Sequence, residues 1–249
     1  MGTRSLVVLF EDSDLLVLDK PAGLHTAPLQ PAETGTLLDQ VIALFPEVAA
    51  VPGVKPVEPG LVHRLDRETS GLVVVARTAE AFALLRRAFV TGGARKVYLA
   101  ACIEGNEEAS AGASMHIASR FAPYGPGRRM VRVVLPGDAK KSFAREAARR
   151  IYETDAEVVF REAGRALLSA RIVRGFRHQV RAHLSFLGWP ILGDALYGFP
   201  APPELPPRLY LHAARLEMAH PRSGAPLVVQ SPLPAEFGAA FPGYKERRT

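Results

Sequence analysis

A polar cluster runs directly into an apolar stretch in the segment His63-Arg64-Leu65-Asp66-Arg67-Glu68-Thr69-Ser70-Gly71-Leu72-Val73-Val74-Val75-Ala76. The apolar part, 72–76, is short and rich in β-branched residues, which is typical of a buried strand. Loops that end at a buried strand often carry functional side chains. The segment therefore predicts a central strand preceded by a candidate functional loop. Spacing alone leaves a second interpretation open, a charged turn in which Asp66 or Thr69 acts as a cap.

The sequence around this strand mixes strand and helix patterns. Further strands are predicted at 5–10, 15–19, 96–103, 157–160, 166–173 and between 209 and 229. Helices are predicted at 37–45, 78–91 and 178–187, and 104–142 is predicted to be loop-rich with short strands. Because no regular β-α-β alternation occurs, we expect an α+β fold. Its central sheet should be mixed, largely antiparallel, and flanked by helices and loops.

The chain is expected to form a single domain. Its 249 residues are ample for a hydrophobic core, and its apolar share of 48% and charged share of 22% are ordinary for a globular protein. These values exclude disorder over the whole chain. No break in composition marks a linker, so we expect one domain over 1–249 with its core at about 6–235.

Cysteine, histidine and apolar patterns exclude several classes of protein. Cys102 is the only cysteine, so an intramolecular disulfide framework is excluded. Seven scattered histidines predict no structural zinc site, which needs four ligands. The sequence has no apolar run of about 20 residues, so no membrane span is expected. The short N-terminal apolar run soon turns acidic and does not resemble a signal peptide, which favours a cytoplasmic location.

Positive charge is concentrated in one part of the chain. Residues 120–181 contain 15 Lys or Arg against 6 Asp or Glu, whereas the remainder contains 16 against 19. A basic segment of this kind favours a polyanionic partner such as nucleic acid. On charge alone, a merely solvated basic face stays an open alternative.

A second cluster combines arginine and histidine at a predicted helix start, in Arg174-Gly175-Phe176-Arg177-His178-Gln179-Val180-Arg181-Ala182-His183. His178 and His183 are five residues apart, so they do not share a helix face as metal ligands four apart would. The cluster therefore predicts no metal site. The first cluster also differs from the His-Arg-Asp loop of protein kinases, because Leu65 lies between Arg64 and Asp66. The sequence also has no kinase-type Gly-rich loop and no Asp-Phe-Gly motif.

The first cluster resembles the signature of the RluA family of RNA pseudouridine synthases. That signature reads His-Arg-Leu-Asp-x-x-Thr-Ser-Gly-Leu, and every fixed position matches between His63 and Leu72. Other segments are similar to further family motifs in the same order: Asp19–Leu24, Lys96–Tyr98, His178–His183, Gly188–Asp194, Leu211–Ala213 and His220–Pro221. The resemblance covers about 15–235, and the joint match is far more specific than any single motif.

The sequence departs from the family pattern at one motif. The family usually has Gly-Arg-Thr-His-Gln where this chain has Gly175-Phe176-Arg177-His178-Gln179, so the arginine lies one place later. The roles of Phe176 and Arg177 therefore stay open. Many relatives carry an N-terminal S4-type RNA-binding domain. Here the Lys-Pro motif lies within the first 20 or so residues, which predicts that this domain is absent.

The resemblance implies a reaction that breaks the ribose C1′–uracil N1 bond, rotates the base and rejoins it through C5. This isomerisation implies no cofactor. Asp66 would be the essential carboxylate, either as a nucleophile or as the base that removes the ribose C2′ proton. Arg181 would keep that carboxylate charged. Tyr98 would stack on the uracil or assist the final proton removal from C5. A structural Arg–Asp pair and a core tyrosine are the alternatives.

The resemblance also implies an RNA substrate, a stem-loop of rRNA or tRNA from which the uridine is extruded. Arg64 would fill the gap or hold a phosphate. The full set of expected substrate-binding residues is His63, Arg64, Thr69, Lys96, Arg128, Arg129, His178 and Gln179. No obligate protein partner is expected. A non-catalytic RNA-binding or RNA-folding protein on the same scaffold is the alternative, and an unrelated small-molecule enzyme has no cofactor motif to support it.

Overall fold

The computed structural model describes residues 6–30, 32–103, 112–138 and 140–245. The chain divides into two compact units, which are described separately. The first unit comprises Met1–Lys96 and His212–Pro232, and the second comprises Val97–Leu211 and Leu233–Thr249. The chain passes from the first to the second inside strand β4 (Ala94–Ile103). This division into units neither confirms nor contradicts the expected single domain, which stays a prediction.

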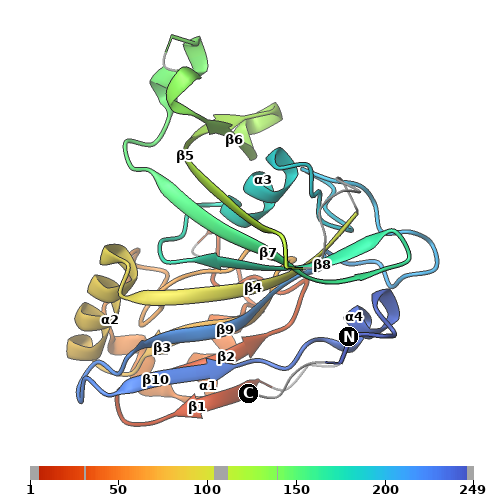
Figure 1. Cartoon of the computed structure of the whole chain (residues 1–249). Helices are drawn as coiled ribbons and strands as arrows, with labels where there is room; N and C mark the ends of the chain where they lie inside the picture. The colour runs from red at the N-terminus through yellow and green to blue at the C-terminus, as the bar shows by residue number, and fades with distance from the viewer. Residues whose placement is uncertain (1–5, 31, 104–111, 139, 246–249) are drawn as a thin grey trace. The chain divides into compact units, whose positions relative to one another are not determined.

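Five strands build the sheet of the first unit: β1 (Val7–Glu11), β2 (Leu15–Lys20), β3 (Ser70–Ala76), β9 (Leu211–Ala219) and β10 (Pro226–Gln230) (Figure 1). β3 is buried along its whole length, as its apolar sequence predicts. β1 pairs antiparallel with β2, β2 with β3, and β9 with β10. β3 and β9 are parallel, with Ser70 opposite His212. The sheet is therefore mixed and mostly antiparallel, as expected.

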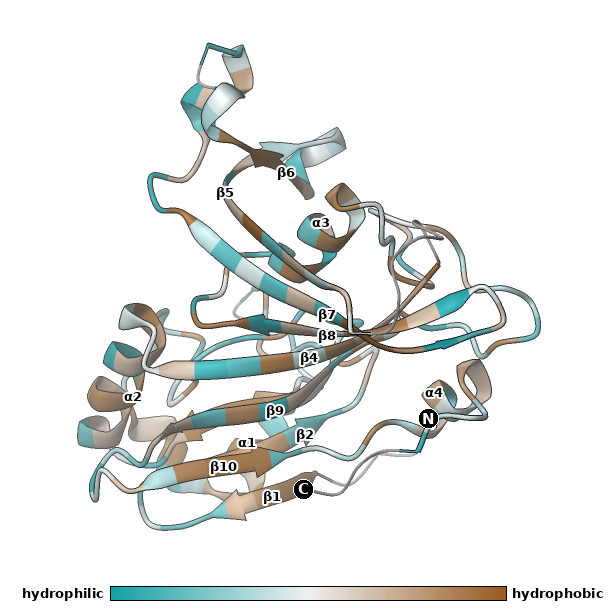
Figure 2. Cartoon of the chain, in the orientation of Figure 1, coloured by the Kyte–Doolittle hydropathy of each residue, from teal (hydrophilic) through white to brown (hydrophobic). Residues whose placement is uncertain are grey.

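Two capped helices pack in the first unit. α1 (Leu37–Leu44) begins with a capping box between Thr36 and Asp39. α2 (Ala79–Thr91) is capped by the Thr78 side chain and ends at Gly92, whose φ is +92°. Hydrophilic and hydrophobic residues lie on different faces of α2 (Figure 2). The boundaries expected for both helices are confirmed to within a residue or so.

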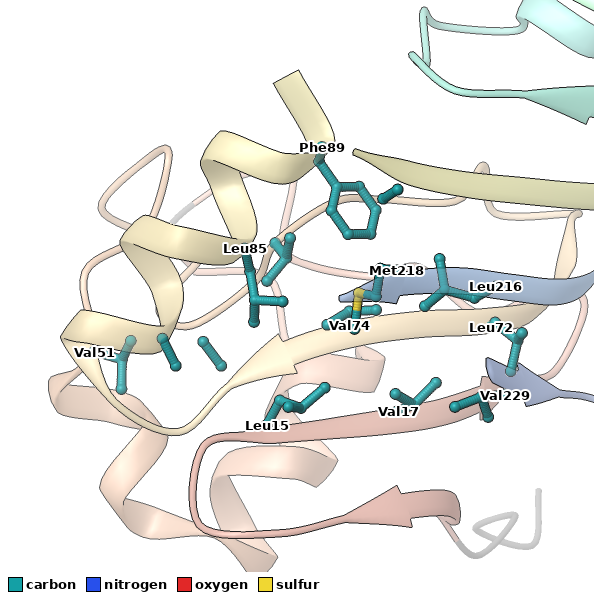
Figure 3. Packing of buried hydrophobic residues seen from close by; sticks show 14 residues of the cluster. Leu15, Val17, Val51, Leu72, Val74, Leu85, Phe89, Leu216, Met218 and Val229 are labelled. Carbon is teal, nitrogen blue, oxygen red and sulfur yellow. The ribbon is translucent and has the colours of Figure 1, made fainter. Parts of the chain in front are cut away.

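The core of the first unit lies between α2 and the sheet. Leu85 and Phe89 of α2 point toward the strands that carry Val17 and Val74 (Figure 3). All four belong to one cluster of buried apolar side chains, to which β9 and β10 contribute Leu216, Met218 and Val229. This packing fixes β3, and with it the C-terminal end of the polar loop at 63–70.

Gly71 is the residue at which that loop becomes strand. Its φ is +109°, a conformation that residues with a Cβ rarely adopt. An added Cβ would also lie 2.3 Å from the carbonyl oxygen of Ala213 on β9. A glycine is therefore required here for the close approach of β3 and β9.

The second unit contains a ladder of antiparallel strands: β5 (Ser114–Tyr124), β6 (Met130–Val134), β7 (Tyr152–Glu162) and β8 (Arg165–Ile172). β5 pairs with both β6 and β7, and β7 pairs with β8. The prediction of a loop-rich region at 104–142 is wrong for β5, which is eleven residues long. Its small and polar residues have weak strand propensity, and pairing with two neighbours stabilises it instead. The part of that prediction at 104–111 lies outside the described residues.

Short helical segments complete both units. The second unit has α3 (Gln179–Phe186), as expected, and α4 (Ala235–Ala240), which the sequence did not predict. Single 3₁₀ turns lie at η1 (Pro46–Ala50), η2 (Pro126–Arg128), η3 (Pro136–Asp138) and η4 (Ser142–Glu146). No helix in the described part of the chain is long and apolar enough to cross a bilayer.

Candidate active site

Lys20, the last residue of β2, forms a hydrogen bond with the backbone of the loop that precedes β3. The Lys20 side chain is fully buried. Its Nζ donates hydrogen bonds to the carbonyl oxygens of Pro21 (2.8 Å), Leu24 (2.8 Å) and Arg67 (3.0 Å). The Arg67 carbonyl also accepts from the backbone N–H of Gly23 at 2.9 Å. A buried ammonium thus joins the 20–24 turn to the residue that follows Asp66.

Thr26 fastens the same loop from its other side. Its hydroxyl donates to the carbonyl oxygen of Leu65 at 2.8 Å and accepts from the Leu65 N–H at 3.2 Å. Arg67 Nε donates to the carbonyl oxygen of Gly23 at 3.1 Å. Asp66 is therefore flanked on both sides by residues whose backbone is bound to the 20–26 segment.

Asp66 itself opens a tight turn. The N–H of buried Thr69 donates to the main-chain oxygen of Asp66 at 3.1 Å. The Asp66 side chain is half-buried. At the end of the turn, Ser70 Oγ lies 2.9 Å from Nδ1 of buried His212 on β9. A carboxylate on so constrained a backbone has the pre-organisation that catalysis needs.

Arg64 lies at the surface and is paired with a buried acid. Its Nη1 is 2.7 Å from Oε1 of Glu58, which is 3% exposed. Lys55 Nζ lies 3.8 Å from the same oxygen. The guanidinium is thus held in one direction while its side chain stays partly exposed, at 34%. That arrangement is compatible with the expected contact to RNA, which stays a prediction.

His63 and Lys96 both contact the ring of Phe89. The His63 ring stacks on it with centroids 4.7 Å apart, and Lys96 Nζ lies 5.0 Å from the Phe89 centroid. Burial and the nearby Lys96 charge lower the pKa of His63 to about 3. Burial also lowers the pKa of Lys96 to about 8. Neutral His63 accepts the Val74 N–H at Nε2 (3.2 Å), so it supports β3.

Arg181 forms a buried bidentate ion pair with Asp194 in the second unit. Nε and Nη2 each lie 2.8 Å from a carboxylate oxygen. Burial alone raises the pKa of Asp194, but the hydrogen bonds and charge of Arg181 outweigh it and lower that pKa. The expected pairing of Arg181 with Asp66 joins residues of different units and stays a prediction.

Tyr98, the third expected catalytic residue, lies on β4 and is 8% exposed. It is the second residue of the second unit, directly after Lys96 and Val97. Burial agrees with both interpretations of this residue, a core tyrosine and a ring at a closed site. Its catalytic role stays a prediction.

His178 and Gln179 begin α3 and have partners within the second unit. His178 adopts a left-handed backbone conformation (φ +57°), and its Nδ1 lies 3.0 Å from the Tyr197 hydroxyl. The Gln179 side chain accepts from the Phe176 N–H and donates to the Glu153 carbonyl oxygen, at 3.0 and 2.8 Å. Because the Gln179 amide is buried and bonded, its direct contribution here is to orient the start of the helix.

His183 holds the same helix to two strands. Its two ring nitrogens lie 2.8 Å from Ser119 Oγ on β5 and 2.7 Å from Thr154 Oγ1 on β7. Burial lowers the pKa of His183 to about 4, so the ring is neutral at physiological pH. His183 therefore positions the helix that carries Arg181.

The departure from the family motif has a structural explanation in this chain. Phe176 stacks on Phe121, with centroids 5.1 Å apart and planes 7° apart, and contacts Tyr152 at 4.9 Å. Arg177 Nη2 donates to the carbonyl oxygens of Arg128 (2.8 Å) and Met130 (3.2 Å). Phe176 thus fills an aromatic core, and Arg177 holds the turn between β5 and β6.

Arg128 and Arg129 lie on that turn, and both are exposed, as predicted. Arg128 Nη2 lies 2.6 Å from Glu146 Oε2. Within the described ranges Arg129 makes no ion pair. The exposure of both residues agrees with an RNA contact without testing it.

Among the residues that the structure describes, one group of side chains has the spacing of metal ligands. Ligand atoms of Asp12, Asp14 and His220 lie within 4.8 Å of one another. Arg222 already binds both oxygens of Asp14, at 2.7 and 2.5 Å, and His220 Nε2 lies 2.7 Å from Asp12. Because an arginine occupies the Asp14 carboxylate, the group fits an ion-pair network between two turns and does not fit a metal site.

Sequence reasoning missed several residues that shape the site. Lys20, Thr26, Asp194 and His183 were not among the expected site residues. Lys20, His183 and Asp194 lie inside motifs that carry the family resemblance, and their place in those motifs could have identified them. Thr26 lies two residues beyond such a motif, and only its contact with Leu65 reveals its role.

The fold is that of pseudouridylate synthase domains. The solved structure of human RNA pseudouridylate synthase domain containing 4 matches with a TM-score of 0.69 at 23% identity, over 94% of this chain and 91% of that one. Human RNA pseudouridylate synthase domain containing 1 matches with a TM-score of 0.68 at 22% identity, over 93% and 85% of the two chains. At these identities the likeness concerns the fold.

Sequence comparison establishes the family. The family described as RNA pseudouridylate synthase matches residues 14–186, and the chain belongs to it. Ribosomal large subunit pseudouridine synthase D of Pseudomonas aeruginosa is 34% identical over 93% of this chain and 69% of its own length. The protein of the same name from Nitrosomonas europaea is 33% identical over 94% and 64%. The resemblance to the RluA family is confirmed, and with it an isomerase that acts on RNA. The chain spans about two thirds of the length of these relatives.

Proposed function

We propose that this protein converts specific uridines of ribosomal or transfer RNA to pseudouridine in the cytoplasm, with Asp66 as the essential carboxylate. The observation that carries the proposal is the anchoring of the Asp66 loop. Lys20 and Thr26 bind the backbone on both sides of Asp66, and the Thr69 N–H closes its turn. Large-subunit rRNA is the first substrate to test, because the relatives from Pseudomonas aeruginosa and Nitrosomonas europaea are named for it.

The reaction needs a charged group beside the sugar and a second group that handles a proton at C5. Asp66 supplies the carboxylate, either attacking the substrate or removing the C2′ proton. Arg181 stabilises its charged form, and the Asp194 pair holds the guanidinium in a fixed orientation. Tyr98 stacks on the uracil and assists the loss of the C5 proton. The base is rotated and rejoined without a redox step, so the proposal includes no cofactor.

The target nucleotide must leave its helix or loop before it reaches Asp66, at a cost of a few kcal/mol. Arg64 occupies the vacated space or binds the adjacent phosphate, with Glu58 holding its guanidinium. The exposed arginines 128 and 129 bind the RNA backbone.

The test is pseudouridine mapping in rRNA and tRNA from cells that lack the protein. Cells complemented with the wild-type gene should regain every lost pseudouridine, whereas cells with Asp66→Asn should regain none at equal protein level. Asp155→Asn is the matched control, because Asp155 is an acid on β7 whose side chain is 59% exposed, and it should restore modification. Restoration by Asp66→Asn would contradict the role of Asp66. If the deletion slows growth without removing any pseudouridine, and Asp66→Asn restores that growth, a non-catalytic RNA-binding protein is favoured.

Independence from metal is tested with the purified protein. Activity should survive EDTA once magnesium is restored for RNA folding. Activity lost to EDTA and recovered with zinc, but not with magnesium, would contradict the proposal.

A further inference from the structure

The most basic part of the chain is a segment of the second unit, 120–150, here called the basic arm. It contains nine Lys or Arg against two acidic residues, although the net charge of the whole chain is only +6. Its described residues comprise the end of β5, all of β6, and the turns η2, η3 and η4. Figure 1 shows β6 beside the end of β5.

One face of the basic arm carries stacked cations and aromatic rings. The Arg132 guanidinium lies 3.9 Å from the ring centroid of Tyr124 and 4.6 Å from that of Phe143. Lys141 Nζ lies 5.7 Å from the Phe143 centroid. Tyr124 pairs with Met130 in the β5–β6 register, so Arg132 is its diagonal neighbour on the same face.

Tyr124 remains 44% exposed although it is aromatic and stacked. Arg132 already holds the ring in place. A ligand that stacks on Tyr124 would therefore immobilise few additional rotatable bonds, which lowers the entropy cost of binding. The turn beneath it is fixed as well, because Arg177 binds the carbonyl oxygens of Arg128 and Met130. The Tyr124 ring and the turn beneath it are therefore held in place, with the Arg132 cation over one face of the ring.

We infer that this face binds an unpaired nucleotide of the RNA substrate, with the base stacked on Tyr124 and the flanking phosphates contacted by Arg132, Lys141 and Arg129. The inference rests on the proposed function for the identity of the partner as RNA. Aromatic rings beside a basic groove are how proteins hold single strands. An A-form duplex keeps its base faces stacked and would use only the charges.

The test compares two probes by fluorescence anisotropy, a ten-residue oligouridine and an RNA duplex of ten base pairs. Tyr124→Ala should weaken oligouridine binding about 5- to 160-fold, as expected for one lost base stack. It should change duplex binding less than about twofold. Tyr124→Phe should bind both probes like the wild type. Phe199→Ala is the matched control, because Phe199 is a similarly exposed ring of the second unit outside the arm.

Three results would overturn the inference: oligouridine binding unchanged in Tyr124→Ala, equal losses on both probes, or no binding of oligouridine by the wild type. Pseudouridine formation is measured in parallel with the same preparations. Tyr124-dependent binding without pseudouridine formation would overturn the proposed function and retain the inferred stacking on Tyr124. Pseudouridine formation with Tyr124-independent binding would do the reverse. Circular dichroism of Tyr124→Phe and Tyr124→Ala checks that both variants fold.

Discussion

Replacing Lys20 with methionine should loosen the loop that carries Asp66. The ammonium binds three carbonyl oxygens, of which only that of Arg67 is also bound by the Gly23 N–H. The two partly buried carbonyls of Pro21 and Leu24 then lose a charged donor at about 1–3 kcal/mol each. The expected loss in the free energy of unfolding is therefore about 2–6 kcal/mol.

The assay is urea unfolding followed by activity measurements under conditions where Lys20→Met is folded. A freed loop should misplace the carboxylate, and a displacement of about 1 Å is enough to lower kcat by about 100-fold. Substrate affinity should change much less, because the exposed binding residues are untouched. Lys55→Met is the matched control: its side chain is 62% exposed, and its loss should cost less than about 1 kcal/mol.

A milder variant guards against failure to fold. Thr26→Val keeps the shape of the side chain and removes only the hydroxyl shared with the Leu65 backbone. It should cost about 1–3 kcal/mol and lower kcat in the same direction. If Lys20→Met and Thr26→Val both unfold like the wild type and keep wild-type kcat, the reasoning on loop anchoring is refuted.

Further outcomes are expected at three places in the fold. Gly71→Ala should destabilise by more than about 3 kcal/mol, since it combines strain at positive φ with a backbone clash, and urea unfolding measures it. Asp194→Asn should lower kcat by freeing Arg181. It should also make the free energy of unfolding depend less on pH at acidic pH. The pKa of Asp194 is lowered on folding, so its contribution is present above the ordinary value of 3.8 and lost as the pH falls below it. Replacing Arg128 and Arg129 by alanine should reduce the salt slope of single-stranded RNA binding by about 1.4 if both contact phosphate, and equal slopes would exclude them.

Local sequence signals were sufficient for much of the first unit. Thr36 and Thr78 cap helices where their positions predicted, because capping depends on residues within one turn. The strand predicted from composition at 72–76 is present as part of β3, which begins at Ser70. β5 was mostly missed because tertiary pairing, not residue propensity, stabilises it.

Long-range contacts of the site could not be read from the sequence. Lys20 binds the Arg67 carbonyl oxygen, 47 residues away in the sequence. No local pattern around either residue predicts that hydrogen bond. The resemblance suggested Arg181 as a partner for Asp66, whereas the ion pair found in the second unit is with Asp194. Phe176 breaks the family motif, and its meaning emerged only from its stacking on Phe121.

The most direct test of the central claim is tritium release from RNA labelled at uridine C5. The proposed reaction forms a bond at C5 and so must release that hydrogen to water. Purified wild-type protein should release tritium from unmodified large-subunit rRNA or tRNA, and Asp66→Asn should release none while binding the same RNA. Release by Asp66→Asn at the wild-type rate, or no release by the wild type from any cellular RNA, would contradict the account.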